Sequence, residues 1–382
     1  RYDTGGKCKK CFDCYYDYYR RNLYFTYTSF KIKTSLIDLN QIKRYNPSKE
    51  WFEIQTIDAH TGGEPLRIII SGYPELKGKT ILEKRKNAKD DFDNFRKALM
   101  WEPRGHADMY GAIIVEPDSV DSHFGVIFIH NDGYSTGCGH AVIALTKVFV
   151  ETGLIPIAEP ETEVRMDVPS GFIRSFAKVK NGKVESVRFQ NVPSFVQKLN
   201  AEINVPRLGK IKYDLAFGGA FYAVVDVDQV GLDCSKKSYN DLIKAGMIIK
   251  HAIMEEVEMN HPTEPEMNYL YGTIFTGPPK DARNHSRNVC IFAEGEVDRC
   301  PTGTGVSARA AIHYARNEIV NEETLTIESI LGSNFHVKVL KTTTLGDYES
   351  VIPEVCGNAF ITGKNTFWIN PEDPLKDGFI LS

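Results

Sequence analysis

Two segments of this chain are apolar on nearly every face of a helix, and they restrict the possible fold more than any other feature. Residues 139–151 combine valine, isoleucine, leucine and phenylalanine with alanine, and residues 305–320 follow the same pattern with more alanine. A helix that is apolar almost all round must be buried on almost all sides. The sequence therefore predicts two core helices, each enclosed by the rest of the chain.

The segments around these helices have the pattern of short β-strands from Trp51 onwards. Alternating or wholly apolar runs are broken by Gly, Pro, Asn and Asp. The clearest expected strands cover residues 112–115, 125–130, 164–168, 172–179, 184–189, 221–227, 271–275, 289–292 and 335–340. Asn181-Gly182 can supply the positive φ angles of a tight hairpin turn between two of them. We expect an α+β fold in which two strand-rich halves each wrap around one helix.

The composition limits the classes of partner. The chain has 382 residues, 42% of them hydrophobic, which is long enough for two ordinary domains. A net charge of −4 gives no field that would gather nucleic acid or an anionic membrane, so neither is expected as a partner. No apolar run approaches the roughly 18 residues needed to cross a bilayer. We expect a cytoplasmic protein that acts on a small molecule.

Residues 1–50 differ from the rest of the chain, being rich in Tyr, Lys and Arg without a sustained period. They contain Cys8, Cys11 and Cys14, whose spacing is compatible with a zinc or iron–sulfur site. No further cysteine follows before Cys138 to complete such a site. We therefore expect residues 1–50 to be a disordered or non-native extension outside the fold.

The first core helix begins with Cys138, which lies between two glycines and is followed closely by His140. Unpaired N–H groups and the positive end of the helix dipole favour a thiolate at this position. The pKa of Cys138 is therefore expected to fall from about 8.5 toward neutrality, which suits a proton-abstracting base. Gly139 would let a ligand approach the backbone. The alternative is a buried structural cysteine.

The second core helix begins in a comparable way, so that Thr302, Gly303 and Thr304 correspond to residues 138–140. This start offers another anion-binding site, and Asp298 just upstream would suit a substrate ammonium group. An ordinary N-cap made by one of the threonines is the alternative. Phosphate-loop, dinucleotide-binding and His-Glu-x-x-His motifs do not occur, so neither a cofactor nor a catalytic metal is expected.

Together these motifs resemble the proline racemase family over nearly all of residues 51–382. The segments that carry the resemblance are residues 58–65, 102–111, 138–140, 217–221, 298–305 and 373–379. The resemblance implies a diaminopimelate-epimerase-like fold, with one half made by residues 51–193 plus 359–382 and the other by residues 194–358. It also implies cofactor-free proton transfer at the α-carbon of a proline-like substrate, in a cleft between the halves, and a homodimer.

Site roles follow from the resemblance at matching positions. Cys138 is the catalytic residue, Gly139 and His140 contact the substrate, and Asp298 contacts its ring nitrogen. Gly303 and Thr304 bind the substrate carboxylate.

One position departs from the racemases of the family, which have a second catalytic cysteine where this chain has Thr302. A threonine hydroxyl is too weak an acid to serve as a resting base. A threonine at this position resembles the trans-3-hydroxy-L-proline dehydratases of the family. The resemblance implies that Cys138 acts as the only base and that the substrate loses water to give pyrroline-2-carboxylate. Thr302 is then expected to position the substrate.

Two other functions stay open. Cys138 could work with Thr302 or with Cys300, as a proline racemase or a hydroxyproline 2-epimerase. Cys300 would have to reach across two residues, roughly 6–7 Å of extended chain, with Pro301 restricting the backbone between them. We therefore expect Cys300 to be structural. The remaining alternative is an inactive homologue that binds an amino acid without turnover.

Overall fold

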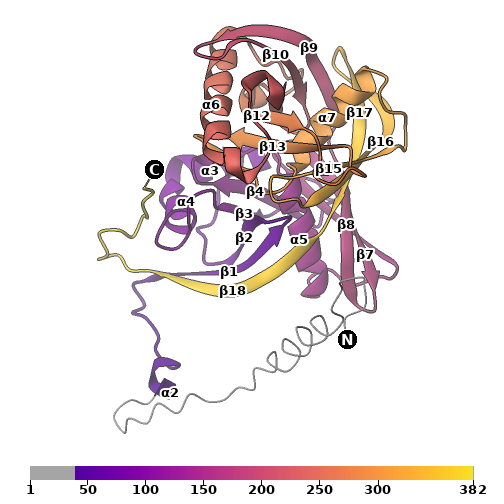
Figure 1. Cartoon of the computed structure of the whole chain (residues 1–382). Helices are drawn as coiled ribbons and strands as arrows, with labels where there is room; N and C mark the ends of the chain where they lie inside the picture. The colour runs from indigo at the N-terminus through magenta and orange to yellow at the C-terminus, as the bar shows by residue number, and fades with distance from the viewer. Residues whose placement is uncertain (1–38, 382) are drawn as a thin grey trace, which may run out of the picture. The chain divides into compact units, whose positions relative to one another are not determined.

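Two long strands, β1 (Phe52–Thr61) and β18 (Ala359–Ile369), pair antiparallel and bring distant parts of the sequence together (Figure 1). The structure is a computed structural model that describes residues 39–381. Residues 49–381 belong to one compact unit, whereas residues 39–48, with the short helix α2 (Leu39–Ile42), belong to a separate one. Cys8, Cys11 and Cys14 lie outside the described residues.

The strands are connected by hydrogen bonds into one system of 18 strands. The first eight after β1 are β2 (Glu64–Ser71), β3 (Tyr110–Val115), β4 (Phe124–His130), β5 (Gly133–Ser135), β6 (Glu161–Val168), β7 (Gly171–Lys180), β8 (Lys183–Gln190) and β9 (Ser194–Val205). The others before β18 are β10 (Gly209–Phe217), β11 (Phe221–Asp226), β12 (Leu270–Gly277), β13 (Ser286–Phe292), β14 (Glu296–Val297), β15 (Thr324–Glu328), β16 (Asn334–Leu345) and β17 (Tyr348–Gly357). Every strand expected from the sequence is confirmed within a few residues.

The two core helices lie among these strands. Helix α5 (Gly139–Glu151) packs against β1, β2, β7, β8 and β18, and α7 (Gly303–Ala315) packs against β9, β10, β11, β16 and β17. Nearly all of their side chains are buried, and both helices contribute to one large hydrophobic cluster. The bounds of α5 are as predicted. The bounds of α7 differ, because it starts at Gly303 and ends before Asn317, which has a positive φ of 57°.

The β7–β8 hairpin also agrees with the sequence. Lys180 is paired with Lys183, and Asn181 and Gly182 have φ angles of 53° and 70°. Two positive φ values in succession are the geometry for which an Asn-Gly turn is selected. The local sequence is therefore sufficient to place this turn.

The structure also contains helices that the sequence did not reveal. Three further helices are α3 (Ile81–Asp91), α4 (Asp93–Met100) and α6 (Tyr239–Glu256), and short 3-10 turns cover Val227–Val230, Lys236–Ser238 and Pro265–Met267. Each of the three helices buries one face and leaves the other polar, so none has the all-round apolar pattern of a core helix. Helix α3 begins with a capping box between Thr80 and Glu83.

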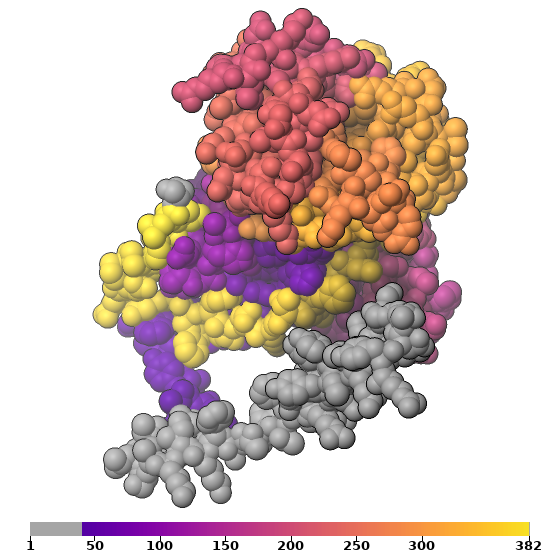
Figure 2. Space-filling view, in the orientation of Figure 1, coloured from indigo at the N-terminus to yellow at the C-terminus, as the bar shows by residue number. Residues whose placement is uncertain are grey.

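The space-filling view shows where the first strands and the last residues of this unit lie on its surface. Yellow side chains of the C-terminal residues lie on the surface beside the purple residues of the N-terminal strands (Figure 2). Among the described residues, no helix combines the length and apolarity needed to cross a membrane.

Candidate active site

The two core helices begin against each other. A Cβ atom added to Gly139, the first residue of α5, would lie 2.5 Å from the Cα atom of Gly303, the first residue of α7. Real Cβ atoms do not approach backbone so closely, so both positions require glycine. Gly139 was predicted to make room for a ligand, but the structure shows that it first makes room for the other helix.

A small cavity of about 20 Å³ lies at this junction and has space for roughly one water molecule. Its walls contain every site residue predicted from the sequence, together with aromatic and acidic residues that the sequence did not single out. The lining residues are Glu64, Tyr110, Gly137, Cys138, Gly139, His140, Tyr222, Tyr271, Phe292, Asp298, Thr302, Gly303 and Thr304. The structure thus brings together residues from both helix starts, although their individual roles stay predictions.

Cys138 is the N-cap of α5 and is buried, with its Sγ atom 3.2 Å from Nδ1 of His140. Burial raises the pKa of the thiol well above its ordinary value, while the Ala141 N–H and the Tyr110 hydroxyl act in the opposite direction. The predicted fall of this pKa was therefore wrong. The helix start does favour the thiolate, but the loss of hydration in a closed site is the larger effect.

His140 is buried beside this thiol, and burial lowers its pKa to about 3. The imidazole is therefore neutral at physiological pH, and its ring nitrogens Nδ1 and Nε2 lie 3.2 Å and 3.7 Å from the sulfur. A neutral imidazole can accept or donate one hydrogen bond at each nitrogen, depending on its tautomer. This arrangement orients the Cys138 side chain.

Two carboxyl groups line the same cavity. Asp298 accepts a hydrogen bond of 2.8 Å from the Cys300 N–H, and Glu64 accepts one of 2.7 Å from the Arg299 N–H. The second oxygen of Glu64, Oε1, is buried and has no hydrogen-bond partner among the described residues. Burial raises the pKa of both groups, and for Glu64 the nearby Asp298 raises it further. A cationic ligand would relieve this concentration of acidic groups.

Thr302 is the N-cap of α7, and it has a positive φ of 68°. This conformation is rare for a β-branched residue and marks a locally strained backbone. Its N–H donates to Sγ of Cys300 at 3.3 Å. Its own hydroxyl is buried and makes no hydrogen bond of good geometry within the described chain, although it is near enough to Asp298 and Cys290 to lower the pKa of both. An unsatisfied buried hydroxyl is costly, so a bound ligand is the natural partner for Thr302 Oγ1.

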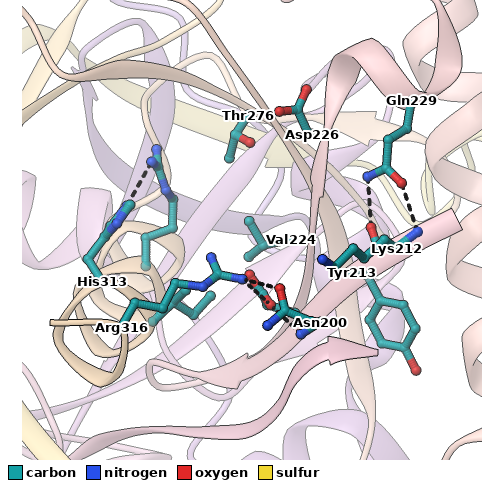
Figure 3. A pocket seen from close by; sticks show the side chains of 12 residues that line it. Asn200, Lys212, Tyr213, Val224, Asp226, Gln229, Thr276, His313 and Arg316 are labelled. Carbon is teal, nitrogen blue, oxygen red and sulfur yellow. Dashed lines mark hydrogen bonds and ion pairs between the residues drawn. The ribbon is translucent and has the colours of Figure 1, made fainter. Parts of the chain in front are cut away.

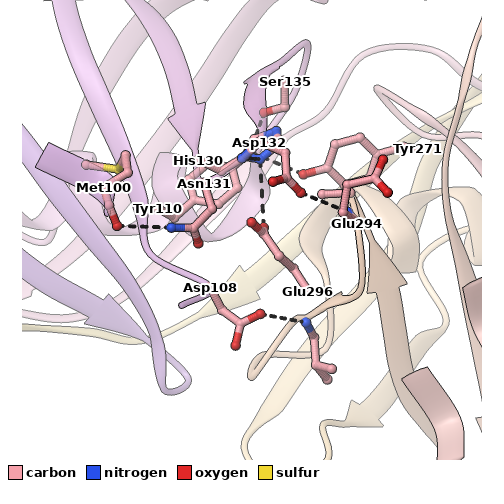
Figure 4. A network of polar contacts seen from close by, with 12 residues as sticks. Met100, Asp108, Tyr110, His130, Asn131, Asp132, Ser135, Tyr271, Glu294 and Glu296 are labelled. Carbon is pink, nitrogen blue, oxygen red and sulfur yellow. Dashed lines mark hydrogen bonds and ion pairs between the residues drawn. The ribbon is translucent and has the colours of Figure 1, made fainter. Parts of the chain in front are cut away.

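The hydroxyl groups of three tyrosines form the rest of the polar lining of this cavity, and the sequence did not predict them. The Tyr222 hydroxyl contacts Thr304 Oγ1 at 2.6 Å, and the Tyr110 hydroxyl contacts Ser135 Oγ and, at 3.4 Å, the Tyr271 hydroxyl. Figure 4 shows Tyr110, Ser135 and Tyr271 grouped together. Tyr222 and Tyr271 lie in strands that looked apolar, whereas Tyr110 lies in the 102–111 motif, which could have drawn attention to it.

The same site contains a group with metal-ligand atoms. Within residues 39–381, His140, Asp298 and Cys300 offer ligand atoms that all lie within 4.8 Å of one another. Asp298 accepts the Cys300 N–H, and Cys300 Sγ accepts the Thr302 N–H, so both side chains already hold the loop before α7. These hydrogen bonds give Asp298 and Cys300 a structural role in the loop, which accounts for their closeness without a metal ion. The expectation of a metal-free enzyme stays a prediction.

A separate cavity of about 270 Å³ lies away from the helix junction, beside the second half of α7 (Figure 3). Its walls carry the Arg316–Asp214 ion pair and a hydrogen bond between Arg309 and His313. None of the site residues predicted from the sequence lines it. The predicted chemistry therefore belongs to the smaller cavity.

Comparisons with known proteins identify the family of this chain. Residues 56–380 match the family described as proline racemase. A trans-3-hydroxy-L-proline dehydratase of Colwellia psychrerythraea is 51% identical over 87% of this chain and 94% of its own length, and a 3-hydroxyproline 2-epimerase of Burkholderia multivorans is 44% identical over 86% and 98%. The crystal structure of a hydroxyproline epimerase from Agrobacterium vitis, with bound trans-4-hydroxy-L-proline, has a TM-score of 0.83 and 31% identity, covering 87% of this chain and 96% of that one. This chain belongs to the proline racemase family.

Proposed function

We propose that this protein dehydrates trans-3-hydroxy-L-proline to pyrroline-2-carboxylate, with Cys138 as the only base. The observation that carries the proposal is the pairing of the two helix starts, in which Cys138 caps α5 and a threonine, Thr302, caps α7. Inversion at the α-carbon requires a base on one face and an acid on the other. Thr302 stands where the second of these groups would be, and its hydroxyl is too weak an acid to serve as a resting base. The names of several relatives at 44–51% identity support the same reaction.

The stereochemistry of the substrate is compatible with one base. In trans-3-hydroxy-L-proline the hydroxyl is opposite the carboxylate, so the α-hydrogen and the hydroxyl share one ring face. The Cys138 thiolate removes the α-proton, and N–H groups at the helix starts stabilise the negative charge that develops on the carboxylate. The electron pair forms the C2–C3 double bond as the C3–O bond breaks. The enamine then tautomerises to the cyclic imine.

The other predicted residues bind the substrate in this proposal. Asp298, with Glu64 beside it, takes the ring nitrogen, because their carboxyl groups are concentrated in one buried cavity. Gly139, His140, Gly303 and Thr304 surround the carboxylate. We also propose the diaminopimelate-epimerase-like division into residues 51–193 plus 359–382 and residues 194–358. A cytoplasmic location, a homodimer and the absence of nucleic-acid partners stay predictions from the sequence.

A substrate panel tests the reaction. We expect trans-3-hydroxy-L-proline to give a cyclic imine that is detected with o-aminobenzaldehyde, and L-proline and trans-4-hydroxy-L-proline to show no inversion in optical rotation. Inversion of any of the three without imine would identify a racemase or an epimerase. Binding of pyrrole-2-carboxylate, a planar mimic of the α-carbanion, without turnover would identify an inactive binding protein.

The pH dependence follows from the burial of Cys138. Because burial raises the pKa of this thiol, the protonated and inactive form is favoured at neutral pH. We expect kcat/KM for imine formation to rise from about pH 6 to about pH 9, since kcat/KM reports the ionisation of the free enzyme. A steady-state series in buffers of constant ionic strength measures this. A profile that is flat or falling over that range would contradict a neutral resting thiol.

A further inference from the structure

We infer that Tyr110 is the general acid that protonates the departing 3-hydroxyl group. This inference rests on the proposed dehydration and adds the proton donor that the reaction still lacks. Hydroxide is a poor leaving group, and general acid catalysis of such a step contributes about 10²- to 10⁴-fold. Neither Cys138, which must take a proton, nor the substrate-binding carboxyl groups supply that donor.

The stereochemistry decides on which side of the cavity the donor must lie. Since the α-hydrogen and the 3-hydroxyl share one ring face, the acid has to be on the same side as Cys138. Thr302 belongs to the start of the opposite helix, and Tyr222 is paired with Thr304 of that helix at 2.6 Å. Thr302 therefore belongs to the helix start opposite the base, and the Tyr222 hydroxyl is already engaged at that helix start.

Tyr110 belongs to the Cys138 side. It extends from β3, and its ring lies edge-on to that of His140, with 4.8 Å between the ring centroids. His140 in turn contacts Cys138 Sγ. Both side chains line the same cavity, and the Tyr110 hydroxyl lowers the pKa of the thiol. A substrate whose α-hydrogen meets Cys138 thus presents its 3-hydroxyl toward Tyr110.

The surroundings of Tyr110 keep its hydroxyl oriented and protonated. Ser135 Oγ and the Tyr271 hydroxyl, at 3.4 Å, hold the phenol oxygen (Figure 4). The ring stacks on His130 with 5.6 Å between centroids. The neighbouring His130 is neutral: burial lowers its pKa to about 3, and the nearby cations Arg96, Lys250 and Arg85 lower it further. Burial raises the pKa of Glu296 on the other side of His130. Burial likewise raises the pKa of Tyr110, so the phenol retains its proton until a stronger base forms.

Cys138 and Tyr110 together account for every proton that is transferred in the reaction. The Cα–H bond breaks and its proton passes to the Cys138 thiolate, while the bonding pair becomes the C2–C3 double bond. The C3–O bond breaks, and the leaving oxygen takes the proton of Tyr110 to give water. The Cys138 thiol then returns a proton to the Tyr110 phenolate, which restores both groups. No oxidant, reductant or cofactor is needed.

The test separates loss of the acid from loss of structure by changing the leaving group. Tyr110→Phe is assayed with trans-3-hydroxy-L-proline and with trans-3-fluoro-L-proline, because fluoride leaves as the anion of a much stronger acid than water. We expect the variant to form imine from the hydroxyl substrate about 10²- to 10⁴-fold more slowly, and to keep elimination from the fluoro substrate within a few-fold of wild type. Tyr73→Phe, which removes another tyrosine hydroxyl outside the cavity, should leave both rates unchanged.

Equal losses with both substrates would overturn the inference, since they would show that Tyr110 only positions or supports the site. Unchanged dehydration of the hydroxyl substrate by the variant would overturn it as well. Ser135→Ala provides a second variant: it removes the partner of the Tyr110 hydroxyl and should slow only the hydroxyl substrate. Failure of the proposed function is recognised separately, because the wild-type protein would then form no imine from trans-3-hydroxy-L-proline.

Discussion

Replacing Cys138 with serine should lower kcat/KM for imine formation from trans-3-hydroxy-L-proline by about 10²- to 10⁴-fold. A serine hydroxyl at the start of α5 is nearly the same size, but it is far too weak an acid to become a resting base. The cavity wall should otherwise be preserved. We therefore expect pyrrole-2-carboxylate to bind the variant about as tightly as wild type, measured by calorimetry beside the rate.

Cys300→Ser is the matched control for this substitution. Cys300 is fully buried, accepts the Thr302 N–H and does not line the cavity. Serine can accept the same hydrogen bond, so we expect the rate to stay within a few-fold of wild type. If Cys300→Ser were as damaging as Cys138→Ser, a two-thiol mechanism would replace the single base.

The substitution Gly139→Ala adds only one methyl group, yet we expect it to reduce both stability and activity more than a methyl group added elsewhere at the site. The added Cβ would lie 2.5 Å from the Gly303 Cα and 2.9 Å from the Phe189 ring, so α5 and α7 would have to move apart. Overpacking of this kind costs typically about 1–3 kcal/mol. We expect a lower midpoint of urea unfolding together with loss of imine formation, because the two helix starts also set the cavity.

Gly133→Ala is the control for this prediction, because a Cβ at Gly133 meets nothing within 4 Å and its φ is not positive. Its unfolding midpoint and rate should match wild type. A Gly139→Ala protein with wild-type stability and rate would show that the close contact between the helix starts is not needed.

The sequence predicted the core of the fold because those signals are local. An all-round apolar pattern predicts burial, which placed α5, and Asn181-Gly182 determines its own turn geometry. Helices α3, α4 and α6 were missed because only one face of each is buried, and a partial apolar stripe is easily taken for strand or loop.

The sequence predicted which residues line the site, because their types and motifs are visible in it. Motif residues at the two helix starts do meet in one cavity. The close approach of Gly139 to Gly303 and the pKa of Cys138 could not be predicted, because each depends on how tightly distant segments pack. Tyr110 was overlooked for a similar reason: a tyrosine in a strand is usually core, and only the fold places it in the same cavity as Cys138.

The most direct test of single-base dehydration follows the products of wild-type protein and trans-3-hydroxy-L-proline by proton NMR over one time course. We predict that pyrroline-2-carboxylate accumulates as the substrate disappears, with no cis-3-hydroxy-D-proline at any time. Accumulation of that α-inverted isomer without the imine would contradict the account, because it would require a second proton-transferring group opposite Cys138.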